Sequence, residues 1–235
     1  MKTTLACGAS VLLACSLMAG EQSPKDIVTA AARSLSDKPN YSWKTTVKVP
    51  EGSQWRPGPT EGKTEKDGFT YVTYSFGENK IETVLKGEKA AATTPDGWQS
   101  LSELENSEGP SRFFARMLRS FKAPAAQAIE IVSGVKELKK TEDFYTGDLT
   151  DEQAKALMTF RSRGASGEGP TVSNAKGSAK FWVKDGLLSK YEFAVKGTMT
   201  WNNNDIDVDR TTTVEIKDVG TTKLTVPEEA KKKLL

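Results

Sequence analysis

The stretch AKFWVKDGLLSKYEFAVKGTMTW, residues 179–201, contains two strand-like runs on either side of Asp185-Gly186. Asp-Gly is a favoured two-residue hairpin turn because both residues tolerate a positive φ. After the turn, large apolar residues alternate with polar ones, and one face carries Tyr191, Phe193, Val195, Met199 and Trp201. The pattern predicts an antiparallel hairpin with one wide apolar face, which the rest of the chain has to cover.

Asp205, Asp207 and Asp209 occupy alternate positions of the expected partner strand, as the first ligands of a calcium loop do. The calcium pattern then requires glycine at the sixth position and glutamate at the twelfth, where this chain has Arg210 and Ile216. We therefore interpret the three aspartates as the solvent-facing side of a strand, with Ile206 and Val208 on the dry side. No metal site is expected.

The remaining elements follow from shorter patterns. Alternation predicts strands at 40–49, 69–76 and 80–94, and a final strand in KLTV (223–226) before a tail that turns helical from Pro227. Capping residues and apolar spacing predict helices at 23–36, at 110–122 and after Thr150. Residues 50–68 are expected to form a long exposed loop or ragged hairpin, and residues 161–177 a mobile loop.

The expected helix at 110–122 has two different faces. Phe113, Phe114, Met117, Leu118 and Phe121 share one face. Arg112, Arg116 and Arg119 share another. One interpretation is an ordinary amphipathic core helix with solvated arginines. The other is a lid whose arginines meet lipid head groups or another anionic surface while its aromatic residues line a hydrophobic cavity.

The order of elements is helix, strands, helices, strands. This order predicts an α+β fold with a meandering antiparallel sheet and helices packed on one face. A curved sheet with a wide apolar face and a small helical cover can leave a cavity between the two layers.

Composition excludes several classes of chemistry. The chain of 235 residues has no histidine, and residues 21–235 have no cysteine either. Histidine-based catalysis, thiol catalysis and the usual zinc sites are therefore excluded from that part. A net charge of +2 argues against a nucleic-acid partner. No cofactor is expected, and the protein is predicted not to be an enzyme, although a hydrolase that uses carboxylates alone stays an alternative.

Residues 1–20 have the features of an export signal: one early lysine, an apolar stretch, and charged residues only afterwards. Two cleavage sites compete. Leu12-Leu13-Ala14-Cys15 fits a bacterial lipobox, which predicts lipidation of Cys15 and cleavage before it. Cleavage by an ordinary signal peptidase near Ala19 or Gly20 is the alternative, and it would discard Cys15.

Several segments together resemble a known family. They are YSWKTTVKV (41–49), DGW (96–98), FYTGDLTDEQAKALM (144–158) and KFWVKDGLLSKYEFAVKGTM (180–199). The chain resembles the periplasmic lipoprotein-carrier superfamily, the LolA/LppX-like half-barrels. The resemblance implies one domain over residues 21–235, in which helices cover the concave face of a curved, unclosed antiparallel sheet. It also implies that the space between sheet and helices takes acyl chains of lipoproteins or lipids.

We therefore expect an exported cell-envelope protein, lipid-anchored at Cys15, that binds an acyl chain or another hydrophobic ligand. It would lie on the periplasmic side, anchored to the outer membrane, or alternatively be soluble in the periplasm or secreted. The candidate cavity residues are Trp43, Phe113, Met117, Phe121, Phe181, Tyr191, Phe193, Met199 and Trp201. An alternative is a structural, interaction or sensor module of the envelope that has no small ligand and contacts an envelope partner through its loops.

Overall fold

The computed structural model describes residues 22–53, 56–159, 170–201 and 204–234, without the side chains of Phe113 and Trp201. Its strands are β1 (Asn40–Lys48), β2 (Thr60–Glu65), β3 (Thr70–Phe76), β4 (Asn79–Lys86), β5 (Lys89–Thr94), β6 (Gly97–Ser100), β7 (Lys139–Lys140), β8 (Tyr145–Asp148), β9 (Thr171–Lys184), β10 (Leu187–Trp201) and β11 (Asn204–Lys217). Its helices are α1 (Pro24–Ser36), α2 (Leu101–Asn106), α3 (Pro110–Arg119), α4 (Pro124–Ser133), α5 (Asp151–Thr159) and α6 (Glu228–Lys233).

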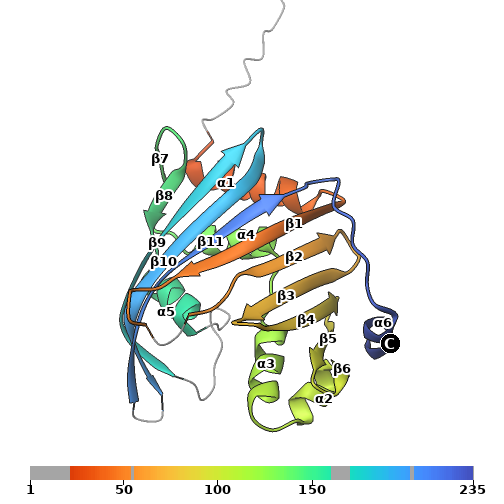
Figure 1. Ribbon diagram of the computed structural model, residues 1–235. Helices are drawn as coiled ribbons and strands as arrows, with labels where there is room; N and C mark the ends of the chain where they lie inside the picture. Colours follow the sequence, from red (N-terminus) through yellow and green to blue (C-terminus); the bar gives the residue numbers. More distant parts are fainter. Residues whose placement is uncertain (1–21, 54–55, 160–169, 202–203, 235) are drawn as a thin grey trace, which may run out of the picture.

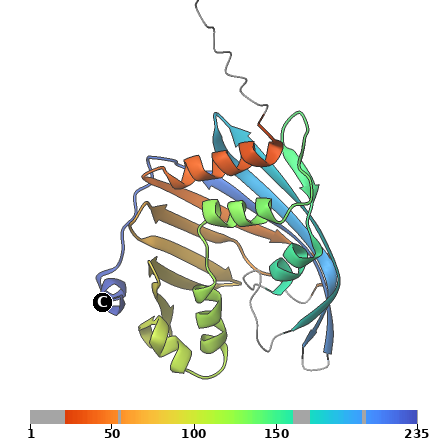
Figure 2. The ribbon, with the colours of Figure 1, turned by 180° about the vertical axis from the view of Figure 1, so that it is seen from behind.

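All eleven strands belong to one antiparallel sheet, in the order β6-β5-β4-β3-β2-β1-β11-β10-β9-β8-β7. The first six strands are sequential neighbours, and the last five return so that β11 pairs with β1. The sheet is strongly curved and does not close on itself (Figure 1). Helices α1, α4 and α5 lie on its concave side (Figure 2). The predicted α+β fold, a curved half-barrel with helices on the concave face, is confirmed.

The hairpin of 179–201 forms as predicted. Asp185 and Gly186 have φ values of 51° and 73°, and Tyr191 on β10 lies opposite Phe181 on β9. Alternation along β10 buries Tyr191, Phe193 and Val195 on the concave side. The prediction that Ile206 lies on the dry face of the partner strand is wrong. Its side chain is 46% exposed because it lies close to the tip of the β10–β11 hairpin.

For residues 50–68 the structure favours the hairpin over the loop, because β2 lies there and pairs with β3. Three other expectations are corrected. Strand β9 begins at Thr171, inside the expected loop of 161–177. The stretch 80–94 contains two strands, β4 and β5, because Gly87 has a φ of 58° and makes a tight turn. Residues 223–226 form no strand, although the predicted helix after Pro227 is present as α6.

The main core lies between α1, α4 and the sheet. Ser23 caps α1 by accepting a hydrogen bond from the Asp26 amide at 3.2 Å, as expected for a serine before a proline-started helix. The buried face of α1 carries Val28, Ala31, Ala32 and Leu35. The buried face of α4 carries Ala125, Ala128, Ile131 and Val132. The alanines let α1 approach both α4 and β10 closely, so this end of the concave side is solidly filled.

The C-terminal segment packs on the other side of the sheet (Figure 1). Val226, Ala230 and Leu234 bury against Val84 and Ala91 of β4 and β5. Lys233 of α6 donates a hydrogen bond of 2.6 Å to Glu103 of α2. This bond, together with the hydrogen bonds between Glu103 and Ser100, lowers the pKa of Glu103 to about 2. Helix α6 thus contacts both the β4–β6 edge of the sheet and α2.

Candidate ligand-binding groove

A groove of about 300 Å³ lies between the concave face of the sheet and helices α3, α4 and α5. Its floor includes Trp43, Thr45, Val47, Tyr74, Tyr191, Phe193, Arg210 and Thr212. Its roof includes Met117, Phe121, Pro124, Gln127 and Leu157. The volume is at the lower end of the range for sites that bind small molecules.

Strand β1 supplies one line of the floor. Trp43, Thr45 and Val47 share a face because side chains alternate along a strand. The indole of Trp43 lies over Gly62 of β2, where a Cβ atom would be only 2.1 Å from the ring. Glycine at position 62 therefore leaves the space that the indole occupies.

The roof depends on the linker between α3 and α4. Helix α3 ends at Arg119, and Pro124 begins α4, so the residue before the proline is held in an extended conformation. Phe121 lies in this linker. Its ring stacks against Trp43, with 6.4 Å between the ring centroids. The aromatic pair joins the roof of the groove to its floor.

Two pairs of polar side chains in the groove are satisfied within the protein. The Tyr191 hydroxyl donates a hydrogen bond of 2.5 Å to Oε1 of Gln127 on α4. Burial raises the pKa of Tyr191 well above its usual value, so the hydroxyl stays protonated. Lys122 and Glu130 form an ion pair with 2.7 Å between Nζ and Oε2.

Arg210 is a buried cation in the floor, only 7% exposed. Its Nη2 donates to the carbonyl oxygens of Leu157 at 2.6 Å and Met158 at 3.3 Å. Both carbonyls belong to the last turn of α5, where the helix has its partial negative charge. Burial lowers the pKa of Arg210 to about 10, so the side chain remains charged at neutral pH.

The structure brings together five of the nine predicted cavity residues. Trp43, Met117, Phe121, Tyr191 and Phe193 all line the groove. Phe181 is fully buried and stacks on Tyr191 from β9, and Met199 is half-buried farther along β10; neither is part of the lining. The side chains of Phe113 and Trp201 lie outside the described part. Ligand binding by these residues stays a prediction.

The three predicted head-group arginines lie on the solvent side of α3. Arg112 and Arg116 are exposed. Arg119 donates to both carboxylate oxygens of Glu105 on α2, one of them at 2.7 Å, and the pair lowers the pKa of Glu105. The apolar side of α3 packs on the sheet, where Phe114 meets Tyr74 edge-on at 5.5 Å. Arg119 therefore links α3 to α2.

Sequence reasoning missed α4 and, with it, Gln127 and Glu130 of the roof. The signal was present as Pro124 at the first position of the helix and Gly134 just after its end. Arg210 was also missed, because it appeared only as a residue that broke the calcium pattern.

Cys15 and the whole predicted export signal lie outside the described residues. Among the described helices, none has both the length and the apolar character that a membrane span requires. Within the same residues, no cluster of three acidic side chains is placed to hold a metal ion.

No protein-family model and no curated protein matches this sequence. Solved structures do align with the chain. The lipoprotein LppX of Mycobacterium tuberculosis is 10% identical, with a TM-score of 0.49 over 86% of this chain and 97% of LppX. LprF from Mycobacterium bovis is 9% identical, with a TM-score of 0.47 over 89% of this chain and all of LprF. A LolA superfamily protein from Nitrosomonas europaea is 11% identical, with a TM-score of 0.36 over 87% and 96%. The chain thus aligns with these proteins over most of its length, at low sequence identity.

Proposed function

We propose that this protein binds one apolar chain, such as the acyl chain of a lipid or lipoprotein, in the groove between the sheet and the helices. The observation that carries the proposal is the groove itself. It is roofed by Met117, Phe121 and Leu157, and its floor contains Trp43 and Phe193. A chain that enters exchanges water for apolar contacts, which is worth about 0.8 kcal/mol for each buried methylene.

Two polar pairs of the groove are compatible with an apolar ligand because the members of each pair satisfy each other. Tyr191 pairs with Gln127, and Lys122 pairs with Glu130. A hydrocarbon chain that contacts these pairs does not have to break a hydrogen bond or leave a buried charge without its partner.

Catalysis by carboxylates is less well supported. Such a hydrolase needs two acidic side chains that face each other across the substrate. Among the described residues, the lining contains one carboxylate, Glu130, and it forms an ion pair with Lys122.

We further propose that the domain is exported and anchored through a lipid on Cys15. The first helix begins at Pro24, so the connecting segment can span at most about 30 Å. Such a short tether would keep the groove close to the membrane surface that supplies an acyl chain.

Mass spectrometry of the full-length protein from native membranes tests the anchor. We expect a denatured mass equal to a chain that starts at Cys15 plus acyl groups. A chain that starts at Gly20 or Glu21 would contradict the anchor and leave a soluble protein. An additional adduct that is present only under native conditions would be the bound ligand.

Blocking the groove tests the binding function. Thr45 faces the groove, whereas Thr46, the next residue of β1, is exposed on the opposite face. In Thr45→Trp, the indole should occupy the space of the chain and weaken the binding of palmitate at least tenfold. Thr46→Trp adds the same side chain to the same strand and should leave the affinity unchanged. Displacement of a fluorescent fatty acid measures both.

Two results would contradict the binding function. Equal affinities of the two tryptophan variants would place the ligand outside the groove. No palmitate binding by the unmodified protein, combined with no native adduct, would favour the alternative of an interaction module without a small ligand.

A further inference from the structure

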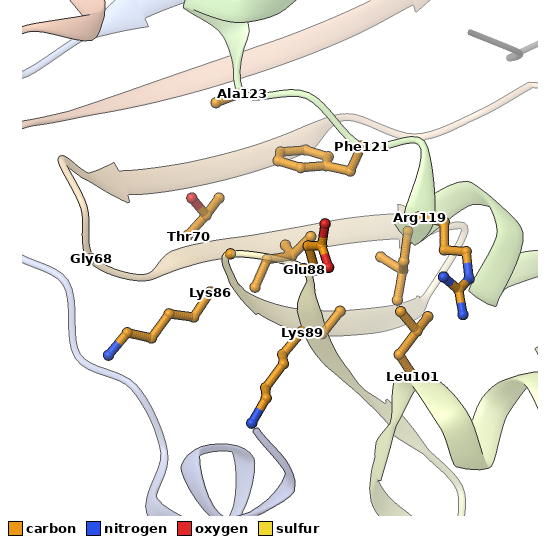
Figure 3. A pocket seen from close by; sticks show the side chains of 13 residues that line it. Gly68, Thr70, Lys86, Glu88, Lys89, Leu101, Arg119, Phe121 and Ala123 are labelled. Carbon is orange, nitrogen blue, oxygen red and sulfur yellow. The ribbon is translucent and has the colours of Figure 1, made fainter. Parts of the chain in front are cut away.

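A second cavity of about 450 Å³ lies beside the groove. It is bounded by strands β3, β4 and β5 and by helices α2 and α3. Its lining combines apolar side chains, Leu85, Leu101 and Leu118, with charged ones, Lys86, Glu88, Lys89 and Arg119. Figure 3 shows Phe121 on the side of this cavity that the α3–α4 linker forms. The proposed function assigns no role to this cavity.

Of the described residues that line the two cavities, Phe121 is the only one common to both. Its neighbours in the linker divide between them: Ser120 and Lys122 line the groove, and Ala123 lines the second cavity. The Phe121 side chain is half-buried and stacked on Trp43. It therefore stands at the boundary between the two spaces.

The other side chains of the linker are poorly suited to form the wall. Ser120 and Ala123 are small, and Ser120 donates its hydroxyl to the Met117 carbonyl at 3.0 Å. Lys122 is long, but its ammonium group is held by Glu130 of α4. Among the linker side chains, the phenyl ring of Phe121 is thus the bulky group between the two cavities.

We infer that Phe121 determines how long a chain the protein can bury, by closing the groove off from the second cavity. This inference rests on the proposed binding function. A chain that fills the groove ends against the ring, and further methylenes remain in water, where they add no affinity. Without the ring, the same chain could continue into the second cavity.

A homologous series of saturated fatty acids, from octanoate to stearate, tests the inference. Affinity is measured for each by displacement of a fluorescent fatty acid, below the micelle concentration. While the groove is filling, each added methylene should raise the affinity about fourfold. In the unmodified protein the rise should stop within the series. In Phe121→Ala it should continue to longer chains, so that stearate binds at least tenfold more tightly than it does to the unmodified protein.

Two further variants control for an effect of the substitution on folding. Phe121→Leu keeps a large apolar group, so it should fold and shift the plateau part of the way. Phe144→Ala removes a half-buried ring that meets Trp182 at 5.1 Å and lines neither cavity, and it should leave the plateau in place. Thermal unfolding of each variant establishes that it is folded.

The outcomes separate the inference from the function on which it rests. If the unmodified protein binds the series but its plateau coincides with that of Phe121→Ala and Phe121→Leu, Phe121 does not limit length and the inference is wrong, while the binding function stands. If Phe144→Ala shifts the plateau equally, the effect is general and the inference is also wrong. If no fatty acid binds the unmodified protein, the proposed function itself fails.

Discussion

Replacing Gly62 with valine is expected to lower the free energy of unfolding by about 3 kcal/mol. Even a single Cβ atom at position 62 would lie 2.1 Å from the indole of Trp43, and valine adds two methyl groups beyond it. The indole is 4% exposed and has Phe121 on one of its faces, so it has little room to move away. The strain should therefore appear both as lost stability and as a displaced groove floor.

Chemical denaturation and the Trp43 partner test this explanation. Glu61→Val places the same side chain on an exposed neighbouring position and breaks only a surface ion pair with Lys44, so it should cost less than about 0.5 kcal/mol. If the clash with the indole is the cause, Gly62→Val should be much less damaging in a Trp43→Leu background, because the two changes are coupled. Additive effects in the double variant would contradict the clash.

The hairpin and the first helix were predictable because local chemistry decides them. Asp185-Gly186 specifies its turn through backbone preference, and the Ser23-Pro24 start of α1 is specified by capping. Tyr191 and Phe193 were assigned to the buried face from alternation alone. Such signals act over a few residues, so they survive in a single sequence.

The groove was only partly predictable because it depends on pairings between distant segments. The residues of strand β2 are polar and resemble a loop in the sequence. The strand is recognised only through its pairing with β1, which places Gly62 under the indole of Trp43. Phe181 and Phe121 look equally suited to a cavity wall. The topology buries Phe181 behind Tyr191 and leaves Phe121 at the boundary of two spaces. No local sequence pattern distinguishes the buried position of Phe181 from the boundary position of Phe121.

Replacing Arg210 with methionine is expected to destabilise the protein by about 2 kcal/mol and to loosen the end of α5. The side chain donates hydrogen bonds from a buried position to the carbonyls of Leu157 and Met158, and hydrogen bonds from charged donors contribute about 1.5–3 kcal/mol. Methionine fills a similar volume but offers no donor, so the last turn of α5 loses its cation. Hydrogen exchange should show faster exchange in α5 than in α1.

Arg210→Lys and Lys196→Met make the test specific. Lysine keeps the charge but not the planar group, so it should recover only part of the stability. Lys196→Met removes a cation whose ion pair with Asp209 is exposed, and it should cost less than about 0.5 kcal/mol. A buried ion pair can often be exchanged for apolar residues without loss, but here the partners are backbone carbonyls that the substitution cannot remove. A stability of Arg210→Met equal to that of the unmodified protein would contradict this prediction. Water would then replace the guanidinium at these carbonyls, and α5 would not need Arg210 to stay over the groove.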